Sequence, residues 1–201
     1  MGRWTWALAM LASLCVAACN TVAPNRLSLA DTAQLRFTGI EVRTAGAAIN
    51  WTAAEDDYLR RRNLSLTDPA LVRTPEAQGH IRDLAARRLK AALERVLASR
   101  PEGARPARLV VTLVKADMPS AAQRIIVGGH PTIRANIEVI DARTGAVLTS
   151  YSGDQGMQVA GQGVLGVVVD GALTAGGMDD QFDRAANDFA RRFKNWLAAG
   201  V

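Results

Sequence analysis

The residues of this chain with the most definite chemistry are Val16-Ala17-Ala18-Cys19, which end an apolar run near the amino terminus. A branched residue, two small residues and a cysteine match the lipobox pattern, in which the cysteine thiol takes a diacylglycerol through a thioether bond. The small residues also suit cleavage by a signal peptidase, which frees the cysteine amine for acylation. We therefore expect Cys19 to be a substrate for lipidation.

The segment before Cys19, residues 1–18, predicts a cleaved signal peptide. Arg3 supplies a short positive region, and an apolar run of about 15 residues follows it, which is shorter than the roughly 20 residues that span a bilayer as a helix. Asn20 stands where an Asp would resemble an inner-membrane retention signal, so the sequence favours the outer membrane, facing the periplasm. The alternative is a secretory signal without lipidation, in which the cysteine stands by chance.

The composition of the remaining chain is that of one domain with its own core. Cys15 leaves with the signal and Cys19 is acylated, so no cysteine remains for a disulfide or a thiolate metal site. The net charge of +5 falls to +4 when Arg3 is removed. For an exported protein this charge favours anionic lipid headgroups over nucleic acid as neighbours. The alternative, which the composition fits best, is an arginine-rich solvated surface with no specific ligand.

Two segments are candidates for contact with the membrane or with a partner protein. Arg60, Arg61 and Arg62 form the sharpest basic cluster, with a solvated helix end as the alternative. The second lies in the glycine-rich segment 153–177 and consists of Val164, Leu165 and Val168, of which Leu165 and Val168 fit an apolar helical stripe. Its alternative is a loop and a short helix packed on the same domain.

The rest of the sequence offers no recognisable catalytic motif. It contains no nucleophile elbow, no zinc-protease helix motif and no phosphate-binding loop. The two histidines, His80 and His130, are not spaced as a metal pair. We therefore expect no catalytic residue, no metal site and no cofactor beyond the diacylglycerol and the N-acyl chain on Cys19, and an envelope hydrolase is the least favoured function.

Periodicity predicts the elements that build the domain. We expect strands at residues 34–43, 108–116, 124–127, 132–140 and 146–151, and helices at 53–62, 75–98 and 180–199. The strand at 34–43 changes phase at Thr38-Gly39, which indicates a β-bulge. Thr52 and Glu55 have the spacing of a capping box, and Thr74 can cap the long helix.

These elements predict a lipidated tether at 19–33 and a single α+β domain at 34–201. The residues from Asp141 to Gly145, with the pattern D-x-x-T-G, predict a hairpin turn. The domain should hold a mixed or antiparallel sheet, with its two main amphipathic helices packed on one face.

The stretch from Arg124 to Leu148 resembles part of small uncharacterised proteobacterial outer-membrane lipoproteins, through its basic residue, glycine turn, amphipathic strand and D-x-x-T-G hairpin. This resemblance implies a non-enzymatic envelope assembly or interaction module with a protein partner. The hairpin is also similar to that of the export lipoprotein CsgG and of the TolB amino-terminal domain. That second resemblance implies the alternative function, a homo-oligomeric export pore.

Overall fold

The computed structural model describes residues 23–100, 103–126, 129–156 and 179–200. Outside these ranges lie the lipobox, residues 16–19, and the glycine-rich contact residues Val164, Leu165 and Val168. The predictions made for those residues therefore stay predictions.

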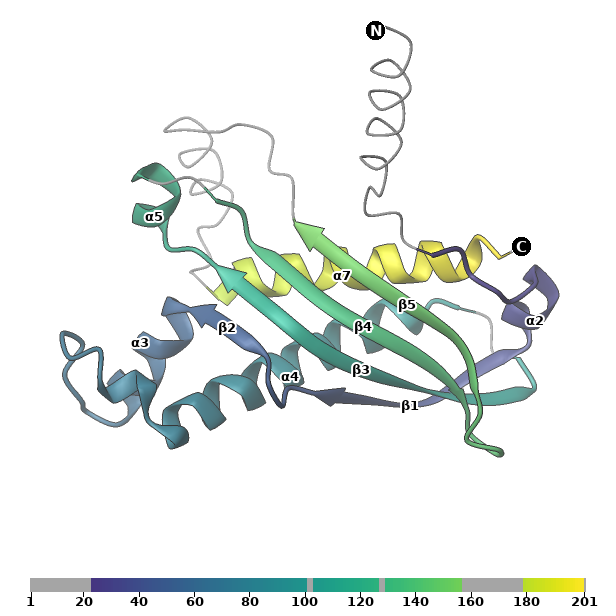
Figure 1. Cartoon of the computed structure of the whole chain (residues 1–201), viewed down its shortest axis with the longest axis horizontal. Coiled ribbons are helices and arrows are strands. Elements are labelled where there is room, and N and C mark those ends of the chain that lie inside the picture. Colours follow the sequence, from purple (N-terminus) through teal and green to yellow (C-terminus); the bar gives the residue numbers. More distant parts are fainter. Residues whose placement is uncertain (1–22, 101–102, 127–128, 157–178, 201) are drawn as a thin grey trace, which may run out of the picture.

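A single five-stranded sheet forms one layer of the domain (Figure 1). Its strands are β1 (Leu35–Arg43), β2 (Ala48–Trp51), β3 (Arg105–Met118), β4 (Thr132–Asp141) and β5 (Val147–Gly156). The order is β1-β3-β4-β5, and β2 follows β1 along the same side of β3. β1 and β2 run parallel to β3, whereas β3, β4 and β5 pair antiparallel. The parallel pairs need a long crossover, which the helices between β2 and β3 provide.

The two long helices, α4 (Pro75–Leu97) and α7 (Asp179–Ala198), pack together on one face of this sheet (Figure 1). Helix α3 (Thr52–Arg61) and the short 3-10 helix η1 (Leu71–Arg73) lie beside α4, and α2 (Leu29–Ala33) lies beside α7. Helix α5 (Ala121–Ile126) connects β3 with β4. This arrangement confirms the predicted α+β class and the two amphipathic helices on one face.

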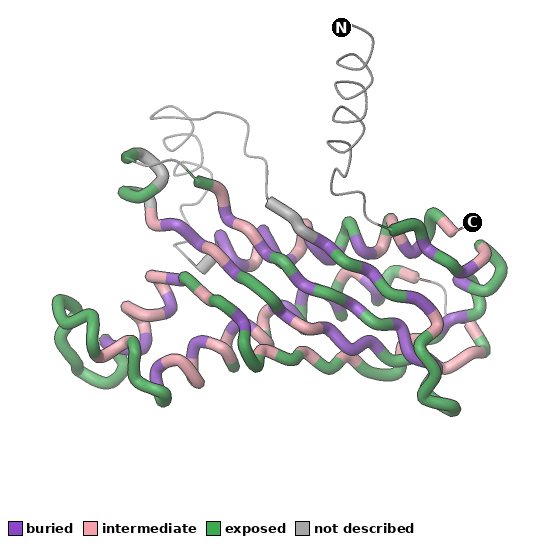
Figure 2. The backbone as a smooth tube through the Cα atoms, in the orientation of Figure 1, coloured by how far each residue is buried: buried purple, intermediate pink, exposed green. Residues whose placement is uncertain are grey.

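Several local predictions are confirmed by the backbone. The pairing of β1 with β3 shifts register between Phe37 and Gly39, where the change of apolar phase indicated a bulge. In β4 the burial alternates strictly from Ile133 to Val139, as expected for a strand with one face in the core (Figure 2). Thr74 caps α4, because its hydroxyl accepts a hydrogen bond from the Ala77 amide at 3.3 Å.

The core lies between the sheet and the two long helices, and aromatic side chains of α7 fill much of it. Phe182 stacks on Trp51 with ring centroids 4.4 Å apart. Farther along the helix, Phe189 and Phe193 pack against Tyr151 of β5 at 5.9 and 5.6 Å. Offset and edge-on ring pairs of this kind contribute about 0.5–1.5 kcal/mol beyond the area they bury. The apolar stripe predicted for the carboxyl-terminal helix is thus the face that holds it on the sheet.

The start of α3 differs from the prediction. Thr52 is the first helical residue and its side chain does not cap the helix, so the predicted capping box with Glu55 is wrong. Residues 48–51 form β2 instead of a connection, a strand too short to show a period. Trp51 is fully buried at its end, and this burial fixes the point where the chain turns into the helix.

The predicted strand at 124–127 is also wrong, because residues up to Ile126 belong to helix α5. A reciprocal capping box explains the difference. The amide of Gln123 donates to the Ser120 hydroxyl at 3.2 Å, and the Ser120 amide donates to Oε1 of Gln123 at 2.8 Å. These two bonds satisfy amides at the start of a helix, which then continues through residues 124–126.

The close approach of β1 to the start of β3 requires a glycine at position 103. A Cβ there would lie 2.1 Å from the backbone carbon and oxygen of Gln34. We expect Gly103→Ala to lower the free energy of unfolding by about 1–3 kcal/mol, because a backbone contact of this kind gives way only by shifting the strand. Urea denaturation followed by circular dichroism measures the change.

Gly39→Ala in β1 is the matched control, since a Cβ at Gly39 meets nothing within 4 Å. It should change the free energy of unfolding by less than 1 kcal/mol, in the range of ordinary strand preferences. Equal effects of the two substitutions would contradict the close approach at Gly103.

Candidate functional site

The chain enters the domain along the carboxyl-terminal end of α7. The indole Nε1 of Trp196 donates to the carbonyl oxygen of Ala23 at 2.7 Å, and Nδ2 of Asn25 donates to the carbonyl of Leu197 at 2.9 Å. Asn25 and Leu27 are buried there. Residues 23–33, which the sequence placed in the tether, are therefore packed on the domain, because they supply both a buried apolar side chain and a partner for a helix-end carbonyl.

Helix α2 holds this entry segment against the ends of the two long helices. Ser28 caps it, since its hydroxyl accepts from the Asp31 amide at 3.1 Å and donates to the Asp31 carboxylate at 2.7 Å. The cap starts a helix of five residues. Leu29 at its first position stays 61% exposed, although it is a large apolar side chain.

A pocket of about 320 Å³ opens between α2 and the carboxyl-terminal ends of α4 and α7. Its walls carry apolar, hydroxyl and cationic groups, contributed by Leu29, Thr32, Ala33, Ser99, Arg100, Lys194 and Ala198. The ammonium group of Lys194 donates to the Ser99 hydroxyl at 2.7 Å. None of the described residues that line it is acidic, so this pocket combines positive charge with an apolar wall.

Arg100 is the most constrained side chain of the pocket. Its Nη2 donates to the Thr32 carbonyl at 2.8 Å, and the guanidinium lies over the Phe37 ring at 5.5 Å. Its Nη1 is buried and has no hydrogen-bond partner. Burial lowers the pKa of Arg100 below its usual value, because the charged form loses solvent. On its other side Arg100 also lines a second pocket of about 240 Å³, between β1 and the end of α4.

The predicted basic cluster lies at the opposite end of the domain, on α3 (Figure 1). Each of its arginines is paired with a carboxylate: Arg60 with Asp56 at 3.7 Å, Arg61 with Asp57 at 2.7 Å, and Arg62 with Glu76. All three arginines are more than half exposed, so these pairs contribute little to stability. They do offset the positive charge that made the cluster a candidate for lipid headgroups.

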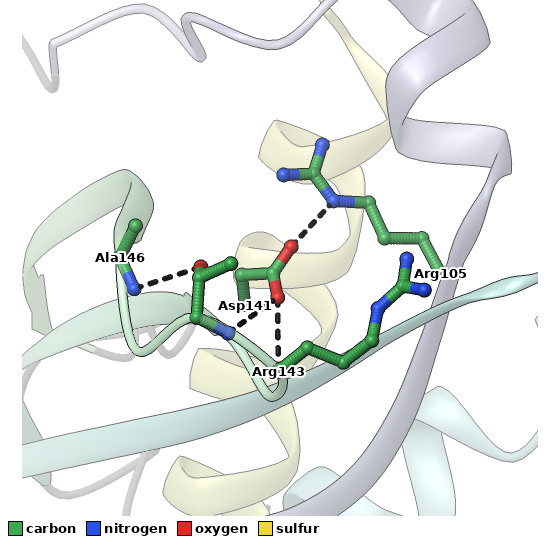
Figure 3. Close-up of polar contacts among 5 residues, drawn as sticks. Arg105, Asp141, Arg143 and Ala146 are labelled. Carbon is green, nitrogen blue, oxygen red and sulfur yellow. Dashed lines mark hydrogen bonds and ion pairs between the residues drawn. The ribbon is translucent and has the colours of Figure 1, made fainter.

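The D-x-x-T-G turn between β4 and β5 is organised around the Asp141 carboxylate (Figure 3). Its Oδ1 accepts hydrogen bonds from the amides of Arg143 and Thr144 at 2.9 and 3.1 Å, and its Oδ2 accepts from Nε of Arg105 at 2.9 Å. The Thr144 hydroxyl accepts from the Ala146 amide at 3.3 Å. Gly145 supplies the positive φ of 75° that the turn needs. Both oxygens of this carboxylate are thus engaged, Oδ1 with the turn and Oδ2 with Arg105 of β3, which is a structural role.

The two histidines lie in ordinary surroundings. The His80 ring packs on Tyr58 with centroids 5.3 Å apart, and His130 contributes its backbone oxygen to the Thr132 hydroxyl. Within the described ranges, no group of three or more His, Cys, Asp or Glu side chains is placed to hold a metal ion. A search of the same residues finds no helix with the length and apolarity to cross a membrane.

Comparisons with known proteins give distant structural neighbours. No protein-family model matches the sequence, and no match was found among curated proteins. A candidate lipoprotein from Caulobacter crescentus aligns with 57% of this chain and 80% of its own, at 18% identity and a TM-score of 0.33.

Two further solved structures align over more of the chain. Protein XCC0632 from Xanthomonas campestris, of family DUF330, aligns with 80% of this chain and 85% of its own, at 10% identity and a TM-score of 0.35. A PelC dodecamer from Paraburkholderia phytofirmans aligns with 84% and 97%, at 15% identity and a TM-score of 0.27. Likenesses this weak assign no family, so the function is argued from the residues of this chain.

Sequence reasoning missed the residues that build the pocket, Leu29, Arg100 and Lys194, as well as Asn25. One signal was available, because Ser28 and Asp31 have the spacing of a helix cap. No sequence pattern relates Arg100 to Lys194, which are 94 positions apart. They line the same pocket only because α4 packs on α7.

The bond of Asn25 to α7 yields a prediction about the entry segment. Asn25→Ala should raise the hydrogen-exchange rate of the Leu27 amide about tenfold or more, because that amide donates to Oδ1 of Asn25 and the segment loses its buried bond to Leu197. Asn195→Ala, at an exposed position of α7, is the control and should leave the rate unchanged. An unchanged rate in Asn25→Ala would show that the segment is held in another way.

The pH dependence of stability follows from Asp141. The Arg105 guanidinium and the two turn amides lower the pKa of this carboxyl from 3.8 to about 2. A lowered folded-state pKa means that the contribution is complete above the unfolded value and is lost as the pH falls from about 4 to about 2. The difference in free energy of unfolding between the protein and Asp141→Asn, measured in urea, should therefore shrink across this window. A constant difference would contradict the assigned pKa.

Proposed function

We propose that this chain is a non-enzymatic lipoprotein of the bacterial envelope, anchored in the outer membrane through Cys19 and facing the periplasm, where its domain binds another envelope protein. The observation that carries the proposal is the lipobox Val16-Ala17-Ala18-Cys19 at the end of an apolar signal. A diacylglycerol together with an N-acyl chain makes an effectively permanent anchor, whereas a single chain binds only marginally.

The way the entry segment is packed supports a short anchor. Ala23 is hydrogen-bonded to Trp196, so only four residue steps separate the domain from Cys19. Four extended residues reach at most about 14 Å. The end of the domain that carries α2 would therefore stay close to the membrane surface.

The same geometry separates the basic cluster from the membrane. Arg62 pairs with Glu76 in the first turn of α4, while Ala23 is bonded to Trp196 near the end of α7, which lies beside the other end of α4. A helix of 23 residues is about 35 Å long. In this orientation Arg60, Arg61 and Arg62 lie far from the lipid to which the chain is anchored. They are therefore candidates for contact with a protein partner.

Lipidation is tested by labelling cells with an alkyne analogue of palmitate and separating membrane from soluble fractions. The protein should carry the label and sediment with the outer membrane. Cys19→Ser should carry no label, because it lacks the thiol that forms the thioether, and should leave the outer-membrane fraction.

Cys15→Ser is the matched control, since it removes the other cysteine of the chain from the same segment. It should be labelled as strongly as the unmodified sequence. Label on Cys19→Ser, or loss of label in both variants, would sink the assignment of Cys19 as the acceptor.

A further inference from the structure

The pocket beside α2 has the chemistry of a site for an anionic amphiphile. Its lining combines the apolar side chains of Leu29, Ala33 and Ala198 with two cations, Arg100 and Lys194. No acidic side chain lines it among the residues that the structure describes. Positive charge without a local carboxylate attracts a negatively charged group, and the apolar wall suits the hydrocarbon attached to that group.

Arg100 has hydrogen-bonding capacity that the protein itself does not use. Its guanidinium bonds the Thr32 carbonyl through Nη2, whereas Nη1 is buried without a partner. A buried donor left unsatisfied is costly, and an anionic oxygen is the acceptor that forms the strongest bonds with a guanidinium. Lys194 is turned toward the same pocket by its bond to Ser99. An anion between these two side chains would use both charges.

The position of the pocket indicates that its ligand comes from the membrane. The entry segment passes the end of α7 from Trp196 to α2, and Lys194 and Ala198 of the same helix end line the pocket, so the pocket and Ala23 lie at the same end of the domain. If Cys19 is lipidated as proposed above, on which this step rests, the pocket lies within reach of the membrane surface. Leu29 lines this pocket and is largely exposed, so its side chain lies at the rim of the pocket.

The size of the pocket limits what can enter it. A volume of about 320 Å³ is at the lower end of the range of about 300–1,000 Å³ for small-molecule sites. It can hold a phosphate-bearing headgroup with the first carbons attached to it, but not two whole acyl chains. The rest of the molecule would have to remain in the bilayer.

We propose that this pocket binds the headgroup of an acidic phospholipid from the membrane that holds Cys19, with the phosphate between Arg100 and Lys194 and the adjoining carbons against Leu29, Ala33 and Ala198. The bound lipid fixes the orientation of the domain on the membrane. The lipid anchor supplies attachment, and the pocket supplies the angle at which the far end is presented.

Native mass spectrometry of the full lipidated protein, purified in mild detergent, tests this proposal. Covalent acylation of Cys19 and non-covalent phospholipid appear as separate mass increments, so failure of the anchor and failure of the pocket are distinguishable. Titration with phosphatidylglycerol should add one bound lipid, and phosphatidylcholine at the same concentration should bind much less. Inorganic phosphate alone should not displace the bound lipid.

Two substitutions test the cationic and the apolar groups of the pocket separately. Both positions are exposed or partly exposed, so neither substitution removes a core side chain. Lys194→Gln should weaken binding of phosphatidylglycerol about fivefold, as expected for the loss of one cation near an anionic lipid. Leu29→Ser should weaken it by removing the exposed apolar rim. Lys115→Gln, the same change on the other face of the sheet, is the control and should bind as the unmodified protein does.

Three results would overturn the proposal. The first is no bound phospholipid on a protein that carries its covalent acyl chains. The second is equal weakening by Lys194→Gln and Lys115→Gln, which would indicate attraction by net charge alone. The third is displacement of the lipid by inorganic phosphate together with unchanged binding in Leu29→Ser, which would indicate a site for a free anion.

Discussion

The burial of the α7 stripe against the sheet is the contact on which the rest of the structure depends. Phe182, Phe189, Phe193 and Leu197 are fully buried, and they reach from Trp51 at the end of β2 to the entry segment at the other end of the domain. Both cysteines of the sequence, Cys15 and Cys19, lie outside the described residues, so no disulfide joins the described elements. Apolar burial, at about 25 cal/mol for each Å² removed from water, is then the main source of stability.

That contact also positions the candidate site. Once α7 lies beside α4, its last turns bring Lys194 next to Ser99 and Arg100, and the Leu197 carbonyl is presented to Asn25. Helix α2 then covers the gap and completes the pocket. The site is thus a consequence of how two long helices end together, and a loosened α7 would change the core, the entry segment and the pocket at once.

The charged groups discussed above differ in whether a carboxylate and a cation are paired in the structure. Asp141 with Arg105, and the three arginines of α3 with their carboxylates, have partners in the structure and serve local order. Arg100 lines the pocket beside α2, whose described lining has no acid, and its Nη1 is buried without a hydrogen-bond partner. The run of arginines in the sequence thus carries charge that carboxylates offset, whereas no acidic side chain lines the pocket beside α2 that holds the single arginine after α4.

Most of the fold could be predicted because periodic burial depends on residues close in sequence. The alternation of β4, the stripe of α7, the bulge at Gly39 and the D-x-x-T-G turn all follow from local patterns. Short elements could not be predicted in this way. β2 has only four residues. The apolar run at 124–127 favours a strand, but the capping box of Ser120 and Gln123 starts helix α5 there instead.

The sequence by itself predicted a lipobox at Cys19, and it determined the types of the long elements and the side of each that faces the core, because all of these depend on the order of neighbouring residues. Only the tertiary structure decided that residues 23–33 pack on the domain, that Arg62 pairs with Glu76 of α4, and that Arg100 and Lys194 share a pocket. Those facts depend on which distant segments meet. The packing of α4 and α7 on the sheet fixes that, and no local pattern encodes it.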